Sequence, residues 1–309
     1  MIFNYSQFSK IFEGGAAIKS SRPILQKEAE KTLAHIESVL FPLLGNGKLD
    51  RDYLLIGSLG KKKNPEDSSG DIDLGISKDF LTDKFGVSGN QILSFLYEKL
   101  KNELPEILGY EPEMKLMPGL NVLSIEWPIE ADPANGTVQV DLIPLSDMDW
   151  AKFIFYSPDY RKNESSYKSA HRNWLFQAIL SALKKVKDRD DDGNILDFDS
   201  YVLRLSDGIF KNSKSFSGVT KRLARAKILP GSEEFITKDP QQAIELMFGP
   251  GYKPDDFKTF EDTWKVVTSK EFIHADKIGE IANDLIRYLN NGNFEIPIGV
   301  EKYTTNETP

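Results

Sequence analysis

Residues 70–76 read Gly-Asp-Ile-Asp-Leu-Gly-Ile, and this stretch decides the fold class of the chain. Acidic and apolar residues alternate along it, which predicts a β-strand, because successive side chains of a strand point to opposite faces of the sheet. Asp71 and Asp73 therefore share one face, while Ile72 and Leu74 point into the core. A strand with two carboxylates on one face and core residues on the other indicates a candidate binding site.

Two other segments have a related pattern. Upstream, Gly57 and Ser58 end a short apolar run, and downstream Asp141 lies inside Val-Gln-Val-Asp-Leu-Ile at residues 138–143. Alternation puts Gln139 and Asp141 on the same face of that second strand. If the two acidic strands are neighbours in the sheet, their carboxylates share one face. Carboxylates this close repel one another, and the arrangement makes sense when cations neutralise them.

The chemistry of these residues favours magnesium as the cation, with manganese as the alternative ion. Magnesium takes oxygen ligands, keeps several waters and completes its shell with substrate phosphates. Two such ions clamp the attacking and the leaving oxygen in a displacement at phosphorus. The Gly57-Ser58 turn suits a phosphate, since glycine permits close backbone approach and the N–H groups and the hydroxyl donate hydrogen bonds. An isolated Asp-x-Asp is usually a solvated face, but the apolar surroundings, the turn and the third acid favour a metal site here.

The composition indicates a globular chain with room for two domains. It has 309 residues, of which 40% are hydrophobic and 28% charged, and a net charge of −8. The acidic balance weakens an interpretation as a general nucleic-acid-binding protein, although a local basic cleft stays open. The chain has no cysteine, and its 3 histidines lie far apart in the sequence. Disulfides and thiolate metal sites are therefore excluded, and hard-cation oxygen chemistry is favoured over zinc.

Export and membrane signals are not found in the sequence. The first residues lack the basic end and the long apolar core of a signal peptide. No stretch approaches the about 18 apolar residues that a membrane span needs. We therefore expect a cytoplasmic protein with no membrane partner.

Periodicity predicts an α+β fold, with an N-terminal segment at 1–23 and a mixed-sheet domain at 24–148. Apolar residues recur every three or four positions over 24–44 and 88–104, which predicts two amphipathic helices. Short apolar or alternating runs predict the strands, at 52–56, 70–77, 113–117, 121–128 and 137–143. The polar loop at 61–70 and the Gly14-Gly15 pair stay open between ordinary loops and substrate contacts.

The second half of the chain is expected to be an all-helical domain at 149–290, followed by a polar tail at 291–309. Candidate helices lie at 168–186, 199–210, 219–228, 240–247, 255–267 and 270–289. The most basic stretch, residues 211–227, is either a charged helix face or a contact for an RNA acceptor or a triphosphate tail.

The Gly-Ser turn, the Asp-x-Asp pair and the later acid together carry a family resemblance. Residues 55–58, then Asp71-Ile72-Asp73-Leu74, then Asp141 resemble the signature of the DNA polymerase β-like nucleotidyltransferase superfamily, over roughly residues 25–145. The resemblance implies a sheet-based catalytic domain, an all-helical second domain and two-metal transfer of a nucleoside monophosphate from a triphosphate. By the same resemblance, Asp71 and Asp73 bind both metals, and Asp141 binds the catalytic metal and helps to activate the hydroxyl. Gly57 and Ser58 would hold the triphosphate.

Relatives with this layout often bring a cationic residue of the helical domain to the triphosphate. The candidates here are Lys168 and Arg172, which lie four residues apart and so share one helix face. The alternative is a solvated pair at the start of a helix.

The expected function is a magnesium-dependent nucleotidyltransferase that moves a nucleoside monophosphate from a nucleoside triphosphate to a hydroxyl acceptor and releases pyrophosphate. An RNA end or a nucleotide is the favoured acceptor. Two alternatives stay open: a catalytically silent nucleotide-binding or assembly protein, and a toxin or immune-signalling enzyme with the same chemistry. Base preference, acceptor and oligomeric state have no local signature in the sequence.

Overall fold

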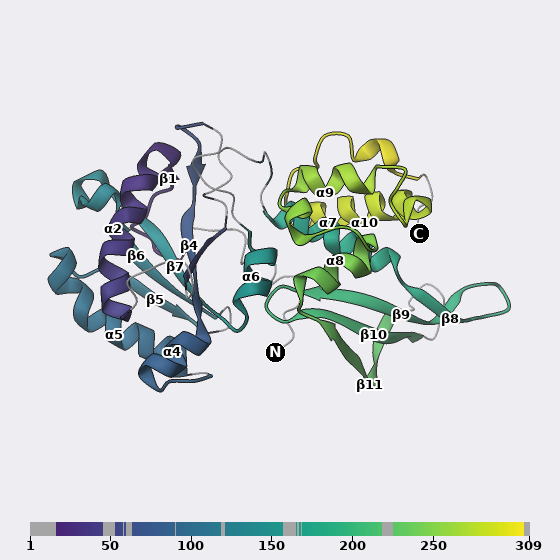
Figure 1. Ribbon diagram of the computed structural model, residues 1–309, viewed down its shortest axis with the longest axis horizontal. Coiled ribbons are helices and arrows are strands. Elements are labelled where there is room, and N and C mark those ends of the chain that lie inside the picture. The colour runs from purple at the N-terminus through teal and green to yellow at the C-terminus, as the bar shows by residue number, and fades with distance from the viewer. Residues whose placement is uncertain are drawn as a thin grey trace. The chain divides into compact units, whose positions relative to one another are not determined.

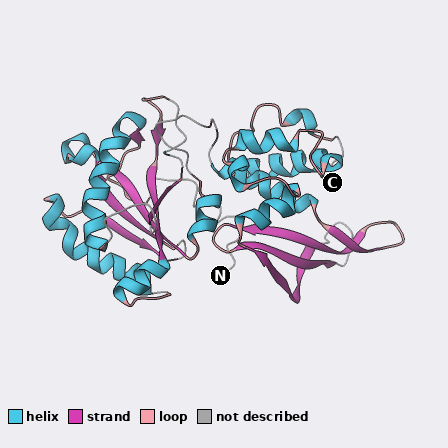
Figure 2. Ribbon diagram, in the orientation of Figure 1, coloured by secondary structure: helices cyan, strands magenta, loops and turns pink. Residues whose placement is uncertain are grey.

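The chain folds into two compact units, which Figures 1 and 2 show as ribbons. A computed structural model describes residues 17–45, 53–57, 59, 64–89, 91–118, 121–156, 165, 167, 169–217 and 225–305. Unit 1 is Met1–Ser169 and unit 2 is Ala170–Pro309. Both units combine helices with strands, which confirms the α+β class.

Unit 1 is built on a five-stranded mixed sheet in the order β2-β4-β7-β6-β5. The strands are β2 (Tyr53–Ile56), β4 (Asp71–Ser77), β5 (Met114–Met117), β6 (Val122–Pro128) and β7 (Thr137–Leu145). The central pair, β4 and β7, is parallel, and the other three pairs are antiparallel. All five strands predicted for this region are confirmed, including the neighbouring position of the two acidic strands.

Three helices cover the apolar face of this sheet, as Figure 1 shows. They are α2 (Gln26–Leu44), α4 (Lys78–Phe85) and α5 (Gln91–Leu108), of which α4 was not predicted. One core cluster joins the buried stripes of the long helices to alternate residues of the strands, among them Leu33, Ile36, Leu40, Leu96, Leu100, Ile72, Leu74, Val140 and Leu142. The opposite face of β4 and β7 carries the acids, as the period of two requires.

The segment before the first helix of unit 1 contains a short strand that was not predicted. Residues Ile24–Leu25 form β1, which pairs with β3 (Ser68–Ser69) just before β4, so the predicted helix over 24–44 starts at Gln26. The N–H of Gln26 also donates to the carbonyl of Asp67 at 2.8 Å. This pairing ties the N-terminal chain to the residues that lead into the first acidic strand.

An ion pair between Arg22 and Glu28 stabilises the start of α2. The Arg22 guanidinium donates to both carboxylate oxygens of Glu28, at 2.7 and 3.0 Å, and one of these oxygens accepts the N–H of Leu25 at 2.8 Å. Arg22 also donates to the carbonyl of Asn135 at 2.9 Å, next to the start of β7. Glu28 thus serves as a helix cap and as a link between the entry segment and the sheet.

Unit 2 corrects the prediction of an all-helical second domain. After α7 (Ser169–Ala182) the chain forms a four-stranded antiparallel sheet in the order β11-β10-β9-β8. Its strands are β8 (Lys185–Arg189), β9 (Ile195–Arg204), β10 (Gly208–Ser217) and β11 (Arg225–Thr237). The predicted helices at 199–210 and 219–228 are therefore wrong over 199–204, 208–210 and 225–228, and residues 218–224 lie outside the described residues.

The physical reason for this error is that β9 and β10 lack a clean alternation of apolar and polar residues, while some of their apolar residues stand at helical spacing. Phe210 pairs with Val202, but Lys214, on the same side of β10 as Phe210, pairs with Phe198, so apolar and polar residues are mixed on this face and no clean alternation marks the two strands. The turn before β10 ends in Gly208 at φ 107°, and a Cβ there would overlap the carbonyl oxygen of Thr237. Asp207-Gly208 is a hairpin signal that the helical interpretation left out.

Helix α6 (Met148–Ile154) belongs to unit 1. The rest of unit 2 is helical, with α8 (Pro240–Phe248), α9 (Phe260–Val267) and α10 (Ile278–Asn291). The helices predicted at 255–267 and 270–289 are shorter than expected, since short 3-10 turns at Pro254–Phe257 and Ala275–Lys277 precede α9 and α10. In the described part of the tail, Val300 is fully buried and Thr305 accepts a hydrogen bond from Asn283 of α10 at 3.0 Å. None of the helices in the described ranges is long and apolar enough to cross a membrane.

Replacing Glu28 with alanine tests the role of the cap. The pKa of Glu28 is lowered, chiefly by its hydrogen bond from Arg22. Its contribution is therefore present above the unfolded-state pKa of about 4.3 and lost as the pH falls through the lower folded-state pKa. We expect Glu28→Ala to lower the free energy of unfolding by about 1 kcal/mol at pH 7, a figure taken from the cap bond alone because Arg22 is 39% exposed.

Urea unfolding of the wild type and Glu28→Ala at pH 7 and pH 3 measures this effect. The difference in free energy of unfolding should shrink towards zero at pH 3. A difference of the same size at both pH values would contradict the assignment.

Candidate metal centre

The three acids that the sequence singled out meet on one face of the sheet. Strands β4 and β7 pair in parallel with Asp73 opposite Asp141 and Asp71 opposite Gln139. One carboxylate oxygen from each of Asp71, Asp73 and Asp141 lies within 4.8 Å of the others. Period two puts Asp71 and Asp73 on the same side of β4, and the parallel register brings Asp141 beside them.

Burial makes this cluster electrostatically unfavourable as a set of free anions. Asp71 and Asp141 are only 6% and 8% exposed. The pKa of Asp73 lies well above its usual value, because the surrounding protein excludes water and because Asp71 and Asp141 stand beside it. The pKa of Asp141 is also raised by burial, although hydrogen bonding from Gln139 acts in the opposite direction. The cluster therefore requires either protons or cations.

The donor set fits a hard cation. All three candidate ligands are carboxylates, the class of ligand that Mg²⁺, Mn²⁺ and Ca²⁺ prefer. Within the described ranges, no second group of three acidic, histidine or cysteine side chains converges in this way. The structure thus supports a cation site at these acids, while the identity of the cation follows from the proposed chemistry.

Gly57 lies against this cluster. It follows Ile56, which pairs with Asp73 across β2 and β4. Its φ is 85°, in the left-handed region, and a Cβ built on it would overlap the Asp73 carboxylate oxygen. Glycine is therefore required here by backbone conformation and by the close approach of Asp73. Ser58, its predicted partner in phosphate binding, lies outside the described residues.

The structure describes only one of the two cationic residues, Lys168 and Arg172, that were predicted to contact the triphosphate. Lys168 lies outside the described residues. Arg172 is on α7, is 1% exposed, and donates to the carbonyls of Phe257 and Lys258 at 3.2 and 3.1 Å. Its guanidinium also lies over the ring of Phe176, 5.4 Å from the centroid. These contacts hold the Arg172 guanidinium in the interior of unit 2. We therefore leave Arg172 out of the proposed nucleotide site.

Gln139 is the residue of this site that sequence analysis did not select. It was placed on the acidic face by alternation, but a buried glutamine carries no motif of its own. In the structure its amide nitrogen lies 2.9 and 3.1 Å from the two carboxylate oxygens of Asp141. The available signal was its position two residues before the third acid.

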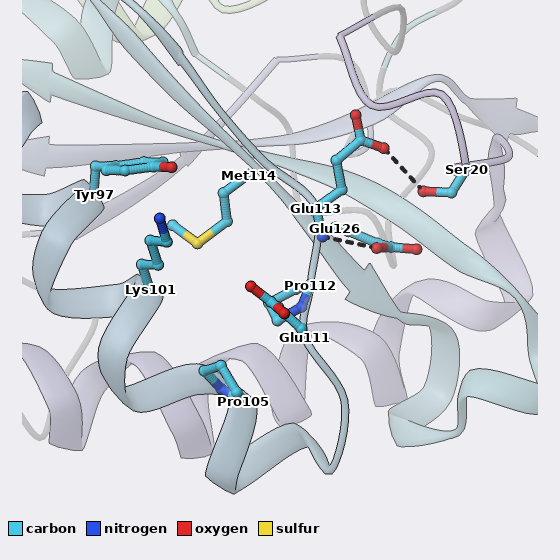
Figure 3. A pocket seen from close by; sticks show the side chains of 9 residues that line it. All are labelled: Ser20, Tyr97, Lys101, Pro105, Glu111, Pro112, Glu113, Met114 and Glu126. Carbon is cyan, nitrogen blue, oxygen red and sulfur yellow. Dashed lines mark hydrogen bonds between the residues drawn. The ribbon is translucent and has the colours of Figure 1, made fainter.

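A separate pocket of about 500 Å³ opens at the β5 edge of unit 1, as Figure 3 shows. Side chains of Tyr97, Lys101 and Met114 point into it, and Glu113 and Glu126 line its other side. The Glu113 N–H donates to the Glu126 carboxylate at 2.9 Å. None of the three clustered aspartates lines this pocket, and no sequence pattern predicted it.

No family model matches the chain, and no curated protein matches it. The functional proposal therefore rests on the geometry of the site.

Replacing Asp73 with asparagine tests whether the carboxylates are held together against their own repulsion. The raised pKa of Asp73 means that ionising this group costs stability as the pH rises, so at alkaline pH we expect the Tm of Asp73→Asn in EDTA to exceed that of the wild type by about 2–4 °C, the shift for roughly 1 kcal/mol in a unit of this size. Mn²⁺ should raise the Tm of the wild type and have little effect on Asp73→Asn. The control is Asp83→Asn, which changes an exposed acid on α4.

Differential scanning fluorimetry with and without Mn²⁺ gives all of these values. A metal-free Asp73→Asn protein that melts below the wild type, or that Mn²⁺ stabilises as strongly, would show that the acids do not form a shared cation site.

Replacing Gly57 with alanine tests the close approach of the turn to Asp73. The new methyl group must displace the Asp73 carboxylate, and the backbone must leave φ 85° or bear strain of about 1 kcal/mol or more. We expect weaker Mn²⁺ binding together with a lower Tm. Gly86→Ala is the matched control, since Gly86 has φ 67° but nothing within 4 Å of its Cβ position. Equal Mn²⁺ affinity in the two variants would remove Gly57 from the site.

Proposed function

We propose that the protein is a nucleotidyltransferase that moves a nucleoside monophosphate from a nucleoside triphosphate to a hydroxyl acceptor. The convergence of Asp71, Asp73 and Asp141 on one sheet face is the observation that carries the proposal. In the reaction the acceptor oxygen bonds to the α-phosphorus, the bond to the bridging oxygen of pyrophosphate breaks, and the hydroxyl gives up its proton.

The carboxylates would divide the work between them. Asp71 and Asp73 would hold two magnesium ions, or manganese in their place, and Asp141 would hold one of them beside the acceptor hydroxyl. When bound, the ions neutralise charge on the phosphates and lower the pKa of the hydroxyl. Asp141, held as a carboxylate by the bound ion, would orient the acceptor hydroxyl and help it to lose its proton.

The Gly57 turn favours nucleotidyl transfer over other reactions that use clustered acids. Clustered carboxylates with bound cations also serve phosphoesterases and nucleases. A glycine turn directly beside the acids would add backbone N–H donors for the β- and γ-phosphates, which leave as pyrophosphate. The proposal therefore keeps Gly57 and Ser58 as the triphosphate-binding turn, in line with the spacing of the sequence motif.

The acceptor is proposed as an RNA end or a nucleotide. The basic stretch at 211–227 supports this choice less strongly than the sequence indicated. Lys211 of β10 is already paired with Glu234 at 3.2 Å and lies 3.9 Å from Asp199, and Lys214 is partly buried. RNA and nucleotides are accordingly tested side by side.

The assay is incubation with α-labelled triphosphates, Mg²⁺ or Mn²⁺, and RNA or nucleotide acceptors, with pyrophosphate release and label transfer as readouts. We expect Asp141→Asn to lower the rate by a factor on the order of 10²–10³, typical for the loss of a group that stabilises charge in the transition state. Asp83→Asn, on the surface of the same unit, should keep wild-type activity.

Two results would sink the proposal. One is the absence of pyrophosphate release with every triphosphate and acceptor. The other is a doubly substituted protein, Asp71→Asn with Asp73→Asn, that keeps the wild-type rate.

A further inference from the structure

The side chain of Gln139 connects the third carboxylate to the N-terminal chain. It is 2% exposed, and its amide nitrogen donates to Asp141, 2.9 and 3.1 Å from the two oxygens. Its amide oxygen accepts the N–H groups of Ala17 and Ile18, at 2.9 and 3.0 Å. Both ends of a buried carboxamide are therefore used, one by the acid cluster and one by the backbone at residues 17–18.

These contacts also fix which way the carboxamide points. Two backbone N–H groups can only be met by the amide oxygen, and an ionised carboxylate can only be met by the amide nitrogen. Turning the group over would set oxygen against carboxylate oxygen and N–H against N–H. Docking of Ala17 and Ile18 thus determines that Gln139 presents a donor to Asp141.

Residues 17–25, which we call the strap, are held against β7 and against β3, which leads into β4. The Arg22 N–H donates to the Thr137 carbonyl at the start of β7, at 2.8 Å. Ile24 and Leu25 pair with Ser69 and Ser68, just before β4. Ile18 is 1% exposed. The strap therefore contacts β7 directly and also contacts the residues that lead into Asp71.

A neutral donor suits this position better than a charged one. An arginine or lysine at 139 would place its own positive charge on Asp141 and compete with a bound cation. A glutamate would add a fourth buried anion to the cluster. A glutamine restricts the rotation of the carboxylate and leaves its charge available to a metal.

We propose that Gln139 is the positioning residue of the third carboxylate, and that through it the docked strap forms part of the metal centre. The inference rests on the metal-binding half of the proposed function. Strap docking and cation binding are then coupled in both directions, because each favours the same arrangement of Gln139 and Asp141.

Titration with Mn²⁺, followed by the electron paramagnetic resonance signal of the free ion, tests the positioning role. We expect Gln139→Met to weaken Mn²⁺ binding about tenfold or more, the usual effect of losing an outer partner of a metal ligand. The control is Gln177→Met in unit 2. The Gln177 carboxamide makes a similar bridge, accepting from the Leu203 N–H at 2.8 Å and donating to Ser181 at 3.1 Å. Wild-type affinity in Gln139→Met would overturn the proposal.

Hydrogen exchange of the wild-type protein tests the coupling without a substitution at Gln139 or in the strap. Mn²⁺ should slow exchange at the amides of Ala17 and Ile18, and this slowing should be absent from Asp141→Asn. Unchanged exchange at both amides on addition of Mn²⁺ would overturn the role of the strap, even if Gln139→Met failed to fold.

These readouts separate the inference from the proposed reaction. Weaker Mn²⁺ binding by Gln139→Met in a protein that releases no pyrophosphate supports the inference and removes the reaction. Pyrophosphate release by the wild type, with Mn²⁺ affinity unchanged in Gln139→Met, removes the inference alone.

Discussion

Repulsion among three clustered carboxylates, two of them buried, is the constraint on which the rest of unit 1 depends. Asp71, Asp73 and Asp141 lie on adjacent parallel strands with ligand oxygens within 4.8 Å of one another. Such a cluster destabilises a protein unless something holds the strands in place and something else supplies positive charge. Acids clustered at such a cost fit the cation site that we propose, because functional sites commonly give up stability for binding.

Two features of the fold hold the acids together. On the apolar face, Ile72, Leu74, Val140 and Leu142 are buried under the helices, so the strands that carry the acids cannot separate without exposing the core. On the acidic face, the strap and Gln139 satisfy polar groups that would otherwise be buried without partners. The core fixes the backbone positions, and the strap fixes how the third carboxylate is presented.

The sequence predicted those parts of the fold that follow from local periodicity. Alternation at 70–76 and 138–143 was enough to place the acids on one face, since a slip of one residue would bury them in the core. It could not reveal contacts made over long separations, such as Gln139 with Ala17, 122 residues apart. Helix α4 was missed because it has eight residues and buries only Leu81. The sheet of unit 2 was missed because β9 and β10 lack a clean alternation and some of their apolar residues fit a helical spacing, so only the pairing of strands distant in sequence identifies them.

The central claim is that the three aspartates bind divalent cations as a group. Anomalous diffraction at the manganese edge, from crystals grown with Mn²⁺ and a non-hydrolysable nucleoside triphosphate, tests it most directly. The account predicts anomalous peaks between the carboxylates, at roughly 2.0–2.2 Å from oxygens of Asp71, Asp73 and Asp141, with the triphosphate beside Gly57. Saturating Mn²⁺ with no peak at these acids, or with manganese bound only elsewhere, would contradict it.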